Sequence, residues 1–231
     1  VSLVKSDKYS TQELIDLLSK EQSIMYVEKN EPVQATGITN DTYERYQWAI
    51  KNNGQNGGIN SYDINSEKVE NYSSSEKVIA IIDTGIDFTH PELQNCLWNN
   101  PYSDTELLLG KHGYDFYNND IDPMDDNGHG THVAGIIAGE ANNNSGITGS
   151  MLNNTNTKIM ALKFLNSNGS GSTYKAISAY HYIYRAQQLG INVIAINNSW
   201  GGGTSNSEIL KTAIDLVGNG PNSDGNGALS I

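Results

Sequence analysis

The sequence predicts an α/β fold built on a doubly wound, mostly parallel sheet with helices on both faces, preceded by a small α+β segment. Two observations from residue 77 onward predict the sheet. Short apolar runs rich in β-branched residues alternate with longer segments of helical periodicity, which is typical of βαβ units. The first apolar run is continuous, as expected of a parallel strand that is covered on both faces.

Residues 1–36 predict the small α+β segment. Ser10 and Glu13 have the spacing of a capping box, and leucines at helical spacing follow them. Residues 24–27 have the composition of a short strand. The segment is therefore expected to hold one helix and one strand.

Residues 37–76 are rich in Asn, Gly and Ser and show little apolar patterning. We expect a linker here that wraps onto the following domain. Tyr43, Tyr46 and Trp48 are its candidate anchors because few other large apolar side chains are present.

Residues 77–231 are expected to form the N-terminal part of a larger α/β domain that continues beyond Ile231. The expected strands are 78–82, 158–164, 191–196 and 227–231, and the expected helices are 173–189 and 207–217. Gly190 is a stop signal for the first helix. Ser205 and Glu208 predict a capping box at the start of the second.

The composition excludes several functions. The formal net charge is −12 and the sequence pI is about 4.7, so the chain repels phosphate backbones and is not expected to bind nucleic acid. The same excess of carboxylates suits cations such as calcium. No apolar run approaches the roughly 18 residues of a membrane helix. Cys96 is the one cysteine, which excludes an internal disulfide.

Two short motifs carry candidate chemistry. Asp83 ends the first apolar run, in Ile-Ile-Asp-Thr-Gly, and the carboxyl ends of parallel strands face the functional crevice of such sheets. His129 lies between glycines in Asn-Gly-His-Gly-Thr-His, at the start of an apolar helical segment. A carboxylate paired with a histidine orients the imidazole and stabilises its charged form. Taken singly, a strand-end Asp is more often a cap, and a lone His is more often a structural side chain.

In this order, the two motifs resemble the Asp and His boxes of the subtilases, the family of subtilisin-like serine proteases. Thr-His-Pro-Glu-Leu at 89–93 continues the first box as in the family, and the resemblance covers about residues 46–231. It implies a subtilisin-like fold and an endopeptidase that acts on peptides or proteins. It also implies that Asp83 orients His129, and that His129 is the general base and acid.

Two further stretches resemble the backbone strips with which subtilases hold an extended substrate. Such strips bind by β-augmentation, in which the substrate pairs with exposed main chain on both sides. The resemblance assigns them to Gly169, Ser170 and Gly171, and to Ser199, Trp200 and Gly201. The alternative is a pair of ordinary turns.

The resemblance implies a serine nucleophile, which the family carries in a Gly-Thr-Ser-Met-Ala box. Gly203-Thr204-Ser205 matches only the first three residues of that box, because Asn206 follows and no Ala comes after it. We therefore expect the nucleophile beyond Ile231 and a chain that is inactive alone. Two alternatives stay open: a pseudoprotease that binds peptide or protein without cleaving it, and a nicked enzyme whose C-terminal half is a separate chain.

Structural calcium is the ion that the resemblance implies, and clustered hard oxygen ligands suit it. One candidate loop resembles the calcium loop of thermitase-like subtilases and consists of Asp115, Asn118, Asp120, Asp122 and the Met124 carbonyl. The second candidate resembles the strong subtilisin site and consists of Glu92, Asn143 and the carbonyls of Ser145 and Ile147. The alternative for the first loop is a solvated acidic turn.

The N-terminal segment has its own likeness within the family. Residues 10–30 are similar to the last third of a subtilase propeptide, which acts as a folding chaperone and inhibitor. This implies a zymogen whose own propeptide, 1–36, is a partner, with processing within residues 32–40 and a secreted or cell-surface location. The alternative is an unrelated N-terminal decoration.

Overall fold

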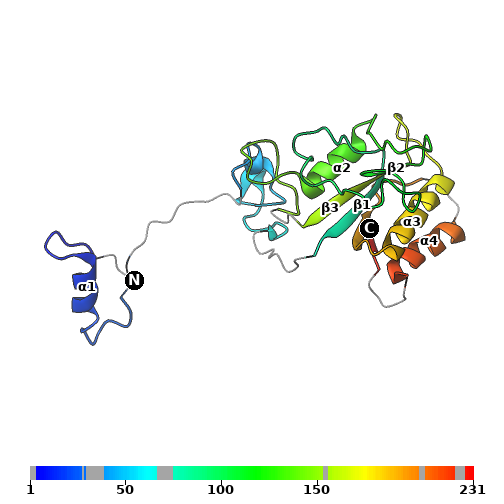
Figure 1. Ribbon diagram of the computed structural model, residues 1–231. Helices are drawn as coiled ribbons and strands as arrows, with labels where there is room; N and C mark the ends of the chain where they lie inside the picture. Colours follow the sequence, from blue (N-terminus) through cyan, green and yellow to red (C-terminus); the bar gives the residue numbers. More distant parts are fainter. Residues whose placement is uncertain are drawn as a thin grey trace. The chain divides into compact units, whose positions relative to one another are not determined.

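The computed structural model of the chain describes residues 4–27, 29, 39–66, 75–152, 156–202, 206–221 and 227–231 (Figure 1). Its Cα packing separates two units, residues 1–36 and residues 37–231. The second unit carries the sheet and every residue with candidate chemistry.

The first unit holds the helix α1, Thr11–Leu18, and the capping box that the sequence predicts. The Ser10 side chain accepts a hydrogen bond from Glu13 N, and the Glu13 carboxylate accepts one from Ser10 N. The strand expected at 24–27 is wrong, because these residues form turns and irregular backbone. Met25 and Tyr26 are 85% and 87% exposed. A strand needs a neighbour to complete its backbone hydrogen bonds, and the described part of this unit offers none.

The second unit is built on a five-stranded parallel sheet in the order β2-β3-β1-β4-β5 (Figure 1). The strands are β1 Lys77–Asp83, β2 Gly113–Asp115, β3 Thr157–Lys163, β4 Val193–Asn197 and β5 Leu229–Ser230. The four strands predicted within residues 77–231 are all present, with ends that shift by one or two residues. The predicted parallel sheet is therefore confirmed.

The strand β2 was not predicted. It has only three residues, which is too short for an apolar pattern to identify. Gly113 permits it, with φ +139° and a position where an added Cβ would lie 1.7 Å from the Ala161 carbonyl oxygen. Only glycine lets the two backbones come this close.

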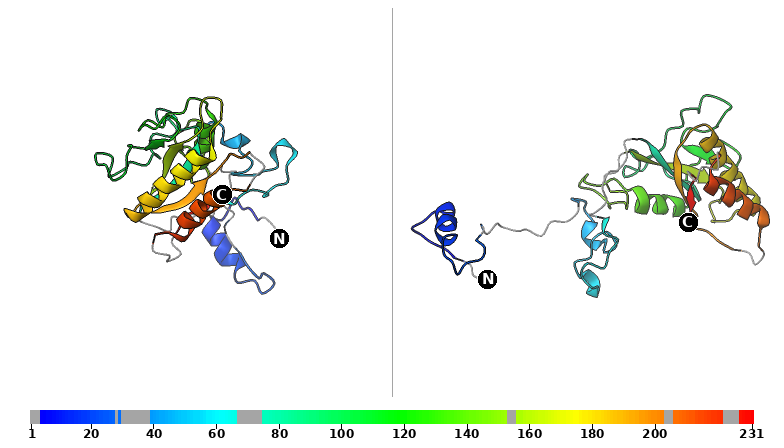
Figure 2. Two further views of the ribbon diagram at one scale, coloured as in Figure 1. Left: turned by 90° about the vertical axis from the view of Figure 1, so that its right-hand side faces the viewer. Right: turned by 90° about the horizontal axis from the view of Figure 1, so that it is seen from below.

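Helices cover both faces of the sheet, as predicted (Figure 2). The helix α2, His129–Ala138, lies on one face, and α3, Thr173–Gln188, and α4, Glu208–Asn219, lie on the other. Side chains of β1 alternate between two cores: Ala80 and Ile82 pack with α3, and Ile81 packs with α2. All three are at most 1% exposed, so β1 is the buried centre of the domain.

The end of α3 matches its prediction, and the start of α4 does not. Gly190 follows α3 with φ +85°, as a C-terminal stop should. The capping box predicted for α4 is wrong, since Ser207 is the N-cap and its Oγ accepts a hydrogen bond from Leu210 N at 3.2 Å. Glu208 is then the first helical residue, two positions too early to close a box. Ser205 lies outside the described residues.

The predicted anchors of residues 39–66 are wrong. Tyr43, Tyr46 and Trp48 are 53–56% exposed. The residues that this segment buries are mostly polar: Asp41, Ile50, Asn52 and Ser66.

Polar side chains fasten this segment to the loop 142–148 of the same unit. The Asp41 carboxylate accepts hydrogen bonds from Asn142 N, Asn143 N and Thr148 Oγ1 at 2.6–3.1 Å. The Gln47 amide exchanges two bonds with the backbone of Thr148, both of 2.8 Å. The segment wraps onto the domain through hydrogen bonds, which an apolar pattern does not predict.

Candidate active site

The carboxyl edge of the sheet brings the two motif residues together. Asp83 is the last residue of β1 and is fully buried. Its Oδ1 lies 2.7 Å from Nδ1 of His129, the first residue of α2. The same oxygen accepts a hydrogen bond from Thr84 N at 2.7 Å. Because the carboxylate can only accept, Nδ1 is the protonated ring nitrogen, and Nε2 is left to act on another group.

The His129 ring is accessible although its partner is not. Its side chain is 47% exposed, against 0% for Asp83. The backbone around it needs glycine: an added Cβ on Gly130 would lie 2.1 Å from the Gly85 carbonyl oxygen. Gly128 has φ +104°, in the left-handed region that favours glycine. The glycines on both sides of His129 therefore allow α2 to begin directly against the end of β1.

Asp125 organises the loop before His129, and the sequence reasoning missed it. Its carboxylate accepts hydrogen bonds from the Thr84 and Thr131 hydroxyls and from the backbone N–H groups of Asn127, Gly128 and Thr131, at 2.6–3.0 Å. Burial acts to raise its pKa, but these hydrogen bonds outweigh burial and hold the pKa below the usual value. Asp125 lies three residues before the N-cap Gly128, so an N-cap pattern does not single it out.

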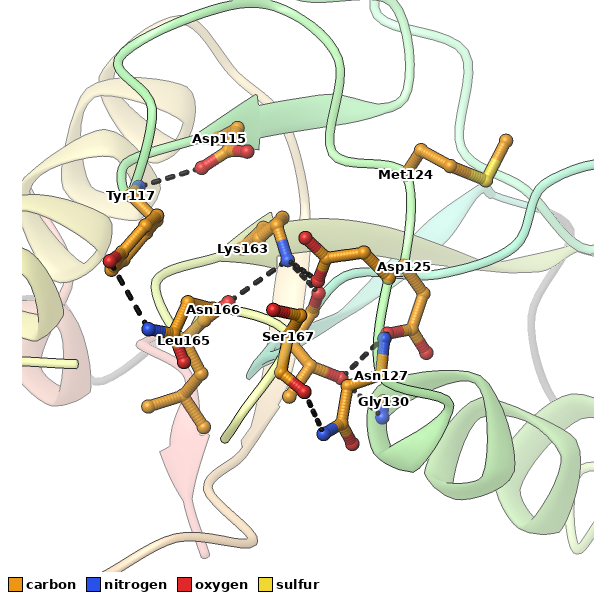
Figure 3. A network of polar contacts seen from close by, with 12 residues as sticks. Asp115, Tyr117, Met124, Asp125, Asn127, Gly130, Lys163, Leu165, Asn166 and Ser167 are labelled. Atoms are coloured by element: carbon orange, nitrogen blue, oxygen red, sulfur yellow. Dashed lines mark hydrogen bonds and ion pairs between the residues drawn. The ribbon is translucent and has the colours of Figure 1, made fainter. Parts of the chain in front are cut away.

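Lys163 is the second residue that the sequence reasoning missed. It is the last residue of β3 and is 1% exposed, yet it carries an ammonium group. Its Nζ donates to the Thr84 carbonyl, the Leu165 carbonyl and the Asp126 carboxylate (Figure 3). A lysine at the end of an apolar run gives no sign of burial, because two of its three partners, Thr84 and Asp126, come from distant parts of the chain.

The two predicted substrate strips lie on either side of Asp83. The strands β3 and β4, which lead into them, are the two neighbours of β1. Gly169, Ser170 and Gly171 are exposed, in a turn in which the Asn166 side chain accepts from Ser170 N. Both strips therefore follow strands adjacent to the one that carries Asp83.

Trp200 links the two sides of this edge. Its ring packs edge-on against Phe164, with 4.9 Å between ring centroids. Its Nε1 is buried and has no hydrogen-bond partner within the described ranges. Ser199 and Gly201 on either side of it are exposed. The tryptophan thus connects the second strip to the end of β3 through an apolar contact.

The first predicted calcium loop satisfies its own polar groups. The buried Asp115 carboxylate accepts from Tyr117 N, Asn118 N and Asn118 Nδ2 at 2.6–2.9 Å. Asp120 accepts from Asp122 N, and Asp122 accepts from Met124 N. In this arrangement the carboxylates close successive turns of the backbone.

In the second predicted calcium site, one carboxylate oxygen has no hydrogen-bond partner among the described residues. Glu92 is 7% exposed, and its Oε2 is buried without a partner among the residues that the structure describes. Its Oε1 accepts from Asn143 Nδ2 at 3.1 Å. An added Cβ on Gly146 would lie 2.6 Å from the Glu92 carboxyl carbon, so the loop that carries Ser145 and Ile147 passes close to this carboxylate.

Three observations limit what the described residues can do by themselves. No group of three or more His, Cys, Asp or Glu side chains among them is arranged to hold a metal. Residues 203–205 lie outside the described part, so the partial serine box stays a sequence observation. Burial raises the pKa of Cys96 to about 12, which makes it a poor nucleophile. In addition, none of the described helices is long and apolar enough to cross a membrane.

Comparison with known proteins identifies the family. Residues 74–229 match the subtilase family. The chain is 39% identical over 182 residues to a cell wall-associated protease of Bacillus subtilis (strain 168), a match that covers 77% of this chain and 18% of that protein. It is 38% identical over 185 residues to a thermophilic serine proteinase of Bacillus sp. (strain AK1), covering 80% and 39%.

Two more proteins are similar to this chain. Thermitase of Thermoactinomyces vulgaris is 37% identical over 141 residues, which cover 61% of this chain and 43% of thermitase. A crystal structure of a cold adapted subtilisin-like serine proteinase matches with 28% identity and a TM-score of 0.42, over 64% of this chain and 46% of that chain. The chain spans less than half the length of these relatives. Since the family match covers most of the chain, the protein belongs to the subtilase family.

Proposed function

We propose that the complete protein is a serine endopeptidase of the subtilisin type, and that this chain supplies Asp83 and His129 of its catalytic triad. The observation that carries the proposal is the 2.7 Å contact between the buried Asp83 carboxylate and Nδ1 of the half-exposed His129 ring. This contact holds the imidazole in the tautomer whose Nε2 can accept a proton. The serine itself is contributed from beyond Ile231.

The chemistry follows from that tautomer. His129 Nε2 takes the proton of the serine hydroxyl as its oxygen attacks the substrate carbonyl carbon. The imidazolium then returns the proton to the leaving amine, and the peptide C–N bond breaks to give an acyl-enzyme. A water molecule completes hydrolysis by the same steps in reverse order. The buried charge of Asp83 stabilises the imidazolium in both halves of the reaction.

Substrate binding would use the two strips at the ends of β3 and β4. Their residues are Gly169, Ser170 and Gly171, and Ser199, Trp200 and Gly201. An extended peptide between them would pair with main chain on both sides, directly above the end of β1. Backbone pairing depends on the extended conformation of the substrate more than on its amino-acid sequence, which suits an endopeptidase.

The direct test is hydrolysis of an unfolded protein substrate by the complete protein. His129→Ala removes the base and should lower kcat by three orders of magnitude or more. Asp87→Asn is a matched control, because the hydrogen bonds of its carboxylate are with Thr89 and His90, which follow it closely in the chain. Cleavage by wild type that is equally fast in His129→Ala would contradict the proposal. No cleavage by the wild type would favour a pseudoprotease that only binds peptide.

The N-terminal unit is proposed to be the end of an inhibitory propeptide. Residues 1–36 form a compact unit of their own. Cleavage within residues 32–40 would release this unit from the active enzyme. N-terminal sequencing of the active form should find a start in that range, and an active form that keeps Val1 would contradict the zymogen.

A secreted or cell-surface location is proposed with it. The support is the similarity to a protein named as cell wall-associated. Fractionation of producing cells should find the activity in the medium or at the cell surface, and activity confined to the cytoplasm would contradict this location.

Structural calcium is proposed at Glu92. The residues fit the ion, because Glu92 Oε2 is a buried carboxylate oxygen without a partner in the described ranges, and Asn143 and the 145–147 loop lie beside it. The bound ion would supply positive charge that neutralises this carboxylate and fastens the loop. The 115–124 loop fits less well, since its carboxylates already accept backbone hydrogen bonds.

A further inference from the structure

A single buried ammonium group joins the three segments that form the carboxyl edge of the site. Lys163 Nζ lies 2.6 Å from the Thr84 carbonyl oxygen, 2.6 Å from Asp126 Oδ1 and 2.9 Å from the Leu165 carbonyl oxygen. These three acceptors match the three protons that an ammonium can donate. The cation is therefore fully coordinated by groups of the protein (Figure 3).

Each acceptor belongs to a segment with a separate task. Thr84 follows Asp83 at the end of β1, and Asp126 lies three residues before His129. Leu165 opens the segment that leads to the first substrate strip, and its N–H bonds to the Asp83 carbonyl at 3.3 Å. Lys163 thus bonds to three segments: the end of β1 next to Asp83, the loop before His129, and the segment that leads to the first substrate strip.

A second link runs alongside and depends on the same loop. Asn127 Nδ2 donates to the Ser167 carbonyl at 2.8 Å (Figure 3). Its Oδ1 accepts from His129 N at 3.1 Å. Asn127 therefore touches both the strip segment and the histidine backbone. Displacing Asp126 would displace its neighbour Asn127, and with it the start of α2.

The two adjacent carboxylates of this loop have different partners. Asp125 is occupied by hydroxyl and backbone donors from its own loop, from Thr84 and from the first turn of α2. Asp126 is the carboxylate that pairs with Lys163, and its side chain is 49% exposed. A buried cation strongly favours keeping its counter-charge, so the ammonium fixes where Asp126 lies.

We propose that Lys163, acting through Asp126, is a positioning residue that sets the His129 loop against Asp83 and the first substrate strip. The inference rests on the proposed function for its catalytic consequence. The Lys163 side chain itself would touch no reacting atom. Its effect is to hold Nδ1 of His129 within hydrogen-bond distance of Asp83, and a displacement of about 1 Å can lower turnover by about 100-fold.

The test uses variants of Asp126 in the complete protein, because Lys163 is buried and its substitution could prevent folding. Asp126→Ala removes the acceptor and should lower kcat about 10-fold or more, with little change in KM. Asp126→Asn keeps an acceptor oxygen and should recover part of the loss. Asp215→Ala is the matched control, since Asp215 is 53% exposed and also pairs with a lysine, on α4.

A spectroscopic readout separates this inference from the proposed function. The His129 Nδ1 proton that is bonded to Asp83 should give a far-downfield NMR signal, which can be followed with or without activity. We expect this signal in the wild type and in Asp215→Ala, and expect it to be broadened or lost in Asp126→Ala. An unchanged signal and kcat in Asp126→Ala would overturn the inference. A wild type that shows the signal but has no activity would overturn the proposed function, and the Asp126→Ala spectrum would still decide the role of Lys163.

Discussion

Asp83 and Glu92 are two buried carboxylates within ten residues of each other, and each keeps one oxygen without a partner in the described structure. Their surroundings differ. Asp83 faces an ionisable ring, so its charge can stabilise a proton that arrives during a reaction. Glu92 faces an amide and a backbone loop, which can share a permanent cation but cannot carry a proton. The same buried charge is thus suited to catalysis in one place and to ion binding in the other.

The largest expected effect is at Asp83. Asp83→Asn keeps the shape but presents an amide, which favours the wrong ring tautomer, and should lower kcat about 10⁴-fold. The fold should survive, so the melting temperature should change little. Kinetics with a peptide substrate measure the effect, and a rate within tenfold of wild type would remove Asp83 from the triad.

Glu92 should behave in the opposite way, with a large effect on stability. Calcium at about 100 times its Kd should stabilise the wild type by about 3 kcal/mol, and a chelator should remove that gain. Glu92→Gln should abolish the response to calcium, with little loss of kcat at low temperature. Thermal melting with and without chelator measures this, and equal responses of the two proteins would exclude the site.

Asp41 supports the same region without an ion. Asp41→Ala leaves the hydroxyl of the buried Thr148 and two backbone N–H groups without their acceptor. We expect a loss of about 2 kcal/mol in the free energy of unfolding. Asp215→Ala, which breaks an exposed pair, should cost less than about 1 kcal/mol. Equal losses of unfolding free energy in denaturant titrations would show that the hydrogen bonds of the 39–66 segment do not stabilise the 142–148 loop.

The smallest expected effect is the pH response of Asp125. Its pKa in the folded protein lies below the usual 3.8, so the stability that it contributes is present above that value and is lost as pH falls through the lower, folded pKa. Because the side chain is only partly buried, we expect about 1 kcal/mol. Comparing Asp125→Asn with wild type across this acid range should show a smaller pH dependence in the variant; identical slopes would contradict it.

Apolar patterning predicted the framework well. Continuous runs identified the strands β1, β3 and β4, because burial on both faces leaves a clear record in the residue types. Patterning failed for β2, which is three residues long, and for residues 24–27, where apolar character came without a neighbouring strand. It also failed for the 39–66 segment, whose Asp41 and Gln47 bond to residues that are far away in the sequence.

The candidate site was predicted only in part, because only some of its contacts are visible as a pattern of residue types. The glycine-flanked motifs pointed to Asp83 and His129, since close approach of two backbone segments requires glycine, and glycine is visible in the sequence. Lys163 left no such sign: its burial depends on acceptors at Thr84, Asp126 and Leu165, which only the fold brings together. Asp125 was overlooked because it lies three residues before the N-cap of α2, where no capping pattern singles it out.

The central claim is that the Asp83–His129 pair activates a serine outside these 231 residues. Fluorophosphonate labelling of the complete protein, followed by mass spectrometry of the labelled peptide, tests it directly. We expect one labelled serine beyond Ile231, and no label in His129→Ala. A label on Ser205, or no label on the wild type with its N-terminal unit removed, would contradict it.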